Sequence, residues 1–75
     1  MTTNINSETE AQAAIETWRH EPLLAQQKKI KTAIESLELS QMYYEQKAND
    51  KGVARAQCCI TLLQKRQAEL GEKAS

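Results

Sequence analysis

The chain has 75 residues, and its ten basic and ten acidic side chains give a formal net charge of zero. A chain this short buries a smaller share of its surface than a larger domain does, and it often needs tight helix packing or self-association to be stable. Zero net charge excludes a strong overall field that would attract nucleic acid or an acidic membrane surface. We therefore expect one small domain that forms a homo-oligomer.

The first residues favour a short helix after a polar tail. Residues 1–7 are mostly polar, and we expect them to form a disordered N-terminal tail. Ser7 stands three residues before Glu10, a capping-box pattern that predicts a helix over residues 8–20. The apolar residues of this helix recur on one face, and we expect the largest, Trp18, to anchor it on the rest of the fold.

The same segment bears on where the protein works. It has neither the basic head nor the apolar centre of a signal peptide, and no apolar run in the chain approaches the roughly 20 residues of a membrane span. We expect a cytoplasmic protein that makes no contact with a membrane.

The longest predicted helix covers residues 22–47. Pro22 disfavours helical dihedral angles at Glu21 but suits the first turn of a helix, so we expect a corner between two helices there. The apolar residues recur every seven positions and predict a coiled-coil-like seam, which Gln27 and Gln41 interrupt. The heptad residues are Leu23, Ile30, Leu37 and Tyr44.

A turn and a third helix follow. Residues 48–52 contain asparagine, aspartate and glycine and predict a turn. The next apolar pattern predicts a helix over residues 53–70, with Gly71 as its C-terminal stop and residues 71–75 as a tail. Gln67 is the polar interruption in this helix. Its seam residues are Val53, Ala56, Ile60, Leu63 and Leu70.

These elements predict the all-α class: a long antiparallel helical hairpin with a short N-terminal helix, forming a single domain over residues 8–70. The pattern leaves open whether the first helix packs on its own chain or is exchanged with a neighbour. We expect assembly into a helical-bundle dimer or a higher oligomer. Antiparallel pairing about the turn brings Tyr44 beside Ala56, Leu37 beside Leu63 and Ile30 beside Leu70.

Two adjacent cysteines are the only residues that suggest chemistry. Structural zinc sites use pairs two to four residues apart with further ligands, whereas Cys58 and Cys59 are neighbours and the only histidine, His20, is distant in sequence. A disulfide between neighbours in a helix is badly strained, and a catalytic thiol needs an adjacent base. The pattern favours small buried filler, with a thiol at a dimer interface as the alternative. We expect no metal site, no cofactor site and no catalytic residues.

A second apolar stripe lies outside the predicted seam. A two-helix hairpin leaves such a stripe exposed, and contiguous exposed apolar surface usually marks contact with another element or another chain. We expect the first helix to cover part of the stripe and a partner to cover the rest. The predicted protein-binding residues are Leu39, Met42, Tyr43 and Leu62.

Two basic clusters support a different hypothesis, because lysine and arginine neutralise phosphates. The antiparallel register places the first cluster near Glu69 and Glu72, so we expect its charge to be largely cancelled locally. The candidate nucleic-acid-binding residues are Lys28, Lys29 and Lys31 in the first cluster, and Lys47, Lys51 and Arg55 around the turn.

The sequence therefore favours a small non-enzymatic helical protein that binds itself and another protein, as an adaptor, regulator or inhibitor. The alternative is a helical dimer that binds nucleic acid or nucleotides through the two basic clusters. Steep loss of binding with added salt would distinguish the alternative.

Overall fold

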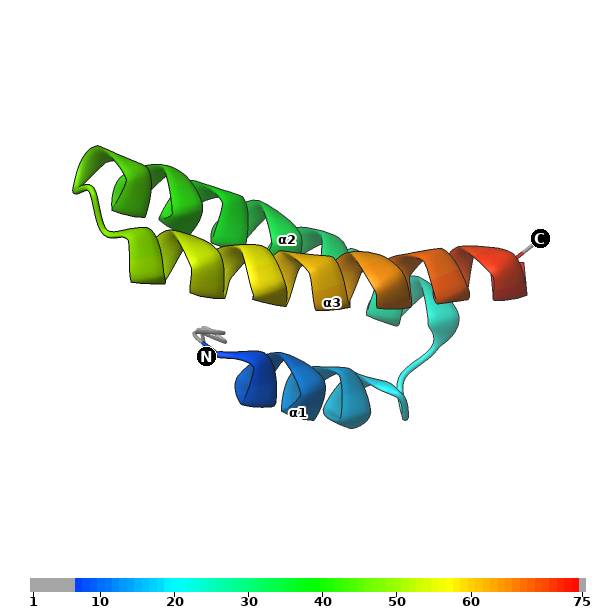
Figure 1. Ribbon diagram of the computed structural model, residues 1–75. Coiled ribbons are helices and arrows are strands. Elements are labelled where there is room, and N and C mark those ends of the chain that lie inside the picture. Colours follow the sequence, from blue (N-terminus) through cyan, green and yellow to red (C-terminus); the bar gives the residue numbers. More distant parts are fainter. Residues whose placement is uncertain (1–6, 75) are drawn as a thin grey trace.

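The computed structural model describes residues 7–74, and within that range it contains three helices joined by short connections. They are α1 (Glu8–Trp18), α2 (Leu23–Gln46) and α3 (Asp50–Ala74). Helices α2 and α3 form a long antiparallel hairpin, and α1 lies along it (Figure 1). The predicted all-α class and the hairpin with a short N-terminal helix are confirmed. The tail predicted over residues 1–7 lies, apart from Ser7, outside the described residues.

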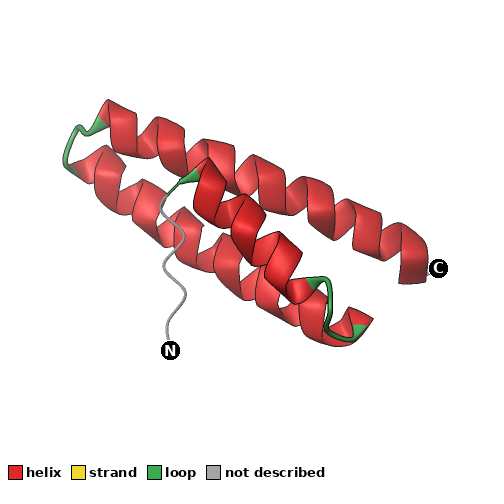
Figure 2. Cartoon of the chain, turned by 90° about the horizontal axis from the view of Figure 1, so that it is seen from below, coloured by secondary structure: helices red, strands yellow, loops and turns green. Residues whose placement is uncertain are grey.

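Helix α1 packs on its own chain, mainly against α3 (Figure 2). The Ser7 side chain caps its N-terminus, because Ser7 Oγ accepts a hydrogen bond of 3.2 Å from the Glu10 backbone N–H. Ala11 and Ala14 are buried, and their small side chains allow close approach to the hairpin. Trp18 is only 8% exposed and belongs to the core, which confirms its predicted anchoring role.

The corner between α1 and α2 is held by backbone and side-chain hydrogen bonds. The Glu21 N–H donates to the Trp18 carbonyl at 2.9 Å, and Pro22 is the N-cap of α2. The Gln26 side-chain amide then donates to the Glu21 carbonyl at 2.7 Å. Gln26 thereby links the first turn of α2 to the corner that precedes it.

The seam between α2 and α3 holds most of the core. Ile30, Leu63 and Leu70 are each at most 1% exposed. Leu37 belongs to the same buried cluster, and it lines one small hollow together with Tyr44 and Ala56. These contacts agree with the predicted antiparallel register. At roughly 1.5 to 3 kcal/mol for each fully buried large side chain, the seam is the main apolar contribution to stability.

The second seam position of α3 differs from the prediction. The heptad was expected to use Val53, Ile60 and Gln67, but Val53 is half-buried and Gln67 is exposed. The helix instead buries the residue before each of these: Gly52, Cys59 and Arg66. Ile60 is buried as well. The polar interruption on α3 is therefore Arg66.

The same displacement occurs on α2. Gln26 is buried, whereas Gln27 is only half-buried. Gln41, the other predicted interruption, is half-buried and donates a side-chain hydrogen bond of 3.0 Å to Gln57. The hairpin therefore has one polar contact between α2 and α3 near each of its ends: Gln41 with Gln57 near the turn, and Gln26 with Arg66 at the open end.

The turn between α2 and α3 is tighter than the sequence predicted. Ala48 has a positive φ of 55°, and the Asn49 N–H donates to the Tyr44 carbonyl at 2.9 Å, which is the long bond of a Schellman motif. The Asn49 side chain then accepts from the Gly52 N–H at 3.0 Å and caps α3. For this reason α3 begins at Asp50, three residues before its predicted start.

The predicted stop at Gly71 is wrong. Helix α3 continues through this residue to Ala74, so the C-terminal tail predicted over residues 71–75 is helical as far as Ala74. Gly71 does not adopt a positive φ. A glycine ends a helix through a left-handed conformation, and without that conformation it is only a weak helix former. Ser75 lies outside the described residues.

The two glycines of α3 predict opposite effects for the same substitution. A Cβ at Gly52 would lie 2.6 Å from the Tyr44 ring, whereas a Cβ at Gly71 would meet nothing within 4 Å. Gly52→Ala should destabilise the protein by about 1 to 3 kcal/mol because Tyr44 must leave its place over α3. Gly71→Ala should stabilise it by up to about 1 kcal/mol through helix propensity alone. Urea unfolding followed by circular dichroism measures both, and two changes of the same sign would contradict this packing.

Candidate functional site

The outward side of α2 carries the most exposed large apolar side chains of the described residues. Its residues are spaced one, three or four positions apart, so they share one side of the helix, opposite the seam. We call this surface the outer face of α2. It consists of Leu24, Lys28, Lys31, Glu35, Glu38, Leu39, Met42 and Tyr43, all exposed.

The apolar members of this face are far from buried. Leu24 is 76% exposed, Leu39 68%, Met42 56% and Tyr43 57%, and these are the large apolar residues of the described chain with the most exposed surface. A single exposed apolar side chain is ordinary, but a group on one face is typical of a contact surface. Three of the four predicted protein-binding residues are therefore brought together, next to the turn. Leu24 stands at the other end of the face.

The Tyr43 ring is held in place by its neighbours. It makes an edge-to-face contact with Tyr44, with ring centroids 5.8 Å apart and an angle of 65° between the rings. The Lys47 ammonium lies 5.8 Å from the centroid of the Tyr43 ring. Tyr44 is in turn packed over Gly52. A restrained exposed tyrosine loses less conformational freedom on binding than a mobile one, which suits it to a contact surface.

Leu62, the fourth predicted protein-binding residue, lies elsewhere. It is half-buried and packs against the core beside α1. It lines an open hollow between α1 and α3 together with Ile15. The docking of α1 has thus covered the part of the apolar stripe that belongs to α3. The part that belongs to α2 remains exposed.

The middle of the outer face of α2 is charged in a definite order. Lys28 and Lys31 come first along the helix, and Glu35 and Glu38 follow. The structure gives none of these four side chains an ion pair within residues 7–73. The sequence pattern singled out the lysines, and it was expected to bring Glu35 and Glu38 near Lys65 and Arg66, but the described residues include no ion pair between these two groups. Leu24 and the position of the acidic pair on this face were not predicted, although helical spacing joins them to Leu39 and Met42.

The six candidate nucleic-acid-binding residues do not form one surface. Lys28 and Lys31 lie near the start of α2, whereas Lys47 and Lys51 flank the turn, about 28 Å away at 1.5 Å per residue. Arg55 is exposed one turn farther along α3. A phosphate backbone is bound by a continuous basic stripe, so this separation gives the alternative function no geometric support.

The positive charge of the first basic cluster was expected to be offset by acidic residues of the third helix, but the structure shows different ion pairs. Lys29 Nζ lies 2.6 Å from Glu21 Oε1, so this lysine pairs with the corner. Glu69 pairs with Arg66 on its own helix instead, at 3.5 Å. The pairing of Lys29 therefore strengthens the corner between α1 and α2.

A shallow apolar hollow adjoins the outer face of α2 at its Leu24 end. It lies between the first turns of α2 and the last turns of α3, and Gly71 contributes no side chain to fill it. Its lining residues include Pro22, Leu24, Lys28, Lys31, Gln67 and Gly71. The hollow offers space beside Leu24 for an apolar side chain from outside the fold.

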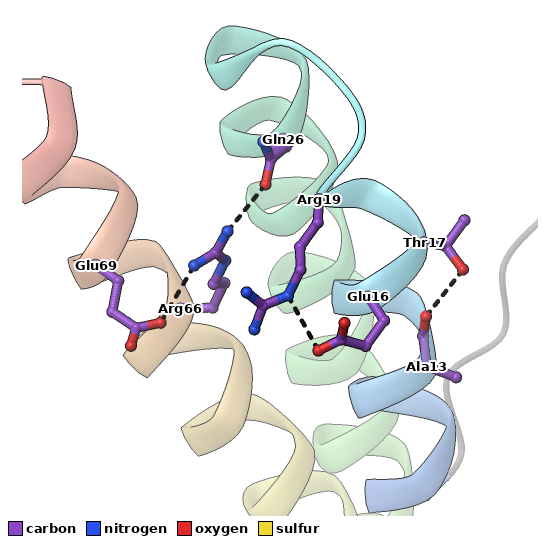
Figure 3. Close-up of polar contacts among 7 residues, drawn as sticks. All are labelled: Ala13, Glu16, Thr17, Arg19, Gln26, Arg66 and Glu69. Carbon is purple, nitrogen blue, oxygen red and sulfur yellow. Dashed lines mark hydrogen bonds and ion pairs between the residues drawn. The ribbon is translucent and has the colours of Figure 1, made fainter.

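The buried polar contact of the hairpin joins Arg66 to Gln26 (Figure 3). Arg66 is 7% exposed, and its guanidinium donates to Gln26 Oε1 at 3.3 Å and to Glu69 Oε1 at 3.5 Å. Its Nε is buried without a partner. Because Gln26 also bonds the Glu21 carbonyl, this amide connects all three parts of the fold: the corner, α2 and α3.

The Gln26–Arg66 contact should be coupled in a double-mutant cycle. Gln26→Leu leaves the buried guanidinium without its main partner and should cost about 1 to 3 kcal/mol of unfolding free energy. Arg66→Met removes the guanidinium and should relieve part of that loss in the double variant. Gln27→Leu at the half-buried neighbouring position is the control. The coupling would be contradicted if the change in unfolding free energy of the double variant equalled the sum of the two single changes within about 0.5 kcal/mol.

The two cysteines occupy different environments. Cys59 is fully buried in the seam, which confirms the filler interpretation for this residue, whereas Cys58 is exposed and the interpretation is wrong there. A hydrogen bond to the Glu8 carboxylate, with smaller effects of burial and of the Glu8 charge, raises the pKa of the Cys58 thiol. Burial raises the pKa of the Cys59 thiol. Both environments disfavour the thiolate, which is the nucleophilic form.

Alkylation tests this assignment. Cys58 should react with iodoacetamide, and Cys59 should react only when the protein unfolds. Because Glu8 raises the Cys58 pKa, the thiolate fraction at pH 8 is lowered, so Glu8→Gln should lower the pKa and speed the reaction. Glu45→Gln, an exposed acidic position on α2, is the matched control and should leave the rate unchanged. Equal rates for the Glu8→Gln and wild-type proteins would contradict the contact.

The described residues hold no further sign of a reactive centre. Among them, no three His, Cys, Asp or Glu side chains are grouped so that they would hold a metal ion. No helix in the same part of the chain is both long and apolar enough to cross a membrane. Comparison with known proteins found no matching family model, no matching curated protein and no matching solved structure.

Proposed function

We propose that this chain is a non-enzymatic protein-binding protein that works as an adaptor, regulator or inhibitor, with the outer face of α2 as its contact surface. The observation that carries the proposal is the grouping of Leu39, Met42 and Tyr43, each more than half exposed, on one face of one helix. Tyrosine and methionine are enriched in the cores of interfaces, where a large side chain enters a pocket of the partner.

The form of the surface defines the partner. A straight face of one helix, about 27 Å from Leu24 to Met42 at 1.5 Å per residue, fits another amphipathic helix better than a globular protrusion. That helix must carry acidic groups opposite Lys28 and Lys31, and basic groups opposite Glu35 and Glu38. Apolar residues must stand at both of its ends.

The environments of the other unusual residues agree with a binding role. The cysteine thiols are held in their less reactive form, and Arg66 is committed to Gln26 and Glu69 inside the hairpin. The exposed apolar residues, by contrast, make no contribution to the core cluster. Their exposure lowers solubility and does not stabilise the fold. Binding of a partner would remove this cost by covering them.

Site-specific photo-cross-linking tests the surface. A benzophenone amino acid replaces Met42 in the full chain, and the matched control carries it at Gln64, an exposed position on α3 outside the outer face of α2. On illumination in the native cell, position 42 should cross-link to a helix with the stated charge order, and position 64 should not. Mass spectrometry of the cross-linked peptides identifies that helix, whether it belongs to another protein or to this chain.

A second change shows whether the contact depends on the apolar residues. Leu39→Ser with Tyr43→Ala in the Met42 cross-linker protein should reduce cross-linking about tenfold or more, because apolar anchors carry most of the energy of such interfaces. Circular dichroism should show that the helices persist, since both residues lie outside the core. Equal cross-linking at positions 42 and 64, or no effect of the double change, would refute the proposed function.

A further inference from the structure

The outer face of α2 has a pattern that matches itself when the helix is reversed. Six of its eight members, all except Leu39 and Tyr43, fall into pairs placed symmetrically about position 33, near the middle of the helix. Each charged pair joins opposite signs, and the outermost pair joins two apolar residues. The pairs are Lys31 with Glu35, Lys28 with Glu38, and Leu24 with Met42.

Such a pattern is what a two-fold symmetric, antiparallel contact requires. In an isologous interface the same patch lies on both subunits, so a residue on one copy contacts the symmetry-related position on the other. Two antiparallel copies of α2, with the symmetry axis against the outer face at the level of position 33 along the helix, place every lysine of the face near a glutamate of the other copy. Leu24 of each copy then lies beside Met42 of the other copy, at both ends of the contact.

We propose that the helix that binds the outer face of α2 is α2 of a second copy of this chain, in an antiparallel two-fold dimer. The proposal rests on one part of the proposed function, that the outer face of α2 is a contact surface, and it names the helix that covers this face. Helices that pair as in coiled coils and most four-helix bundles cross at about 20°, and that geometry keeps the four lysine–glutamate contacts within reach over a face of this length. The exposed side chains that meet there have no ion-pair partners among residues 7–73.

The ends of the contact supply the apolar burial. The hollow beside Leu24, which Gly71 leaves open, lies where Met42 of the second copy arrives. Tyr43 lies next to Met42 and extends the apolar end toward the turn. Leu39 sits between this end and the charged middle. Each apolar end thus receives the opposite apolar end, and no charge is buried without a partner.

The charge order also selects the orientation. In a parallel pair, each lysine would face the same lysine of the other copy and each glutamate the same glutamate, and such like-charge contacts disfavour that arrangement. Charges of this exposed kind contribute more to orientation and specificity than to affinity. The affinity comes from the Leu24 and Met42 ends. A contact limited to one helix face is typical of weak, reversible association.

Charge reversal tests the dimer. Lys28→Glu with Lys31→Glu makes the middle of the face wholly acidic, and Glu35→Lys with Glu38→Lys makes it wholly basic. Light scattering at about 100 µM, a concentration suited to weak interfaces, should give the dimer mass for the wild type and the monomer mass for each variant alone. An equimolar mixture of the two variants should recover the dimer mass, because every charge contact is then favourable.

The control makes the same change of charge elsewhere. Lys51→Glu with Lys73→Glu reverses two exposed lysines of α3 and should leave the wild-type dimer intact. Circular dichroism shows that each variant is folded. A wild type that is monomeric at this concentration, or a mixture that fails to recover the dimer, overturns the second-copy proposal. The proposed function survives that result if position 42 cross-links to another protein, and falls with it if no cross-link forms.

The orientation has its own readout. In a Cys58→Ser background, chains with Leu24→Cys and chains with Met42→Cys are mixed and oxidised. The antiparallel dimer predicts disulfides between positions 24 and 42, with few between two copies of position 24. A majority of links between identical positions would show a parallel pair and overturn the assignment.

Discussion

Burial of the seam between α2 and α3 is the interaction on which the rest of the structure depends. Ile30, Leu63 and Leu70 are almost fully excluded from solvent there, and the fold has few other large apolar contacts. Once α2 and α3 face each other along this line, the opposite side of each helix must be covered by something else or stay wet. Helix α1 is only 11 residues long and packs mainly on α3, so α2 keeps its outer face open.

This constraint explains how much of the fold followed from the sequence. The spacing of seven residues between Ile30, Leu37 and Tyr44 predicted the seam of α2, and the capping box predicted the start of α1. At the second seam position of α3, hydropathy then favoured Val53 over Gly52 and Gln67 over Arg66, because valine is more apolar than glycine and glutamine carries no charge. An arginine enters a seam only when a partner such as Gln26 meets its guanidinium, and periodicity carries no information about that partner.

The candidate site was half predictable for a related reason. Leu39, Met42 and Tyr43 share a face by helical spacing, so local geometry was enough to group them. Leu62 left the group because its exposure depends on where α1 docks, which is a tertiary property. From the sequence alone, Lys28 and Lys31 were grouped with Lys29 as a basic cluster. The structure places these two lysines on the same face as Glu35 and Glu38, and only this grouping shows that two basic residues are followed by two acidic ones along the face.

The outer face of α2 must be open in the lone chain and covered in its complex. The Met42 methyl group reports on this directly, because the chain has only one other methionine, Met1. Its NMR signal, recorded with a soluble paramagnetic agent, should broaden strongly in dilute solution and be protected at high concentration or with the cross-linked partner added. A Met42 methyl that is protected in the dilute monomer, or equally broadened under every condition, would contradict the account.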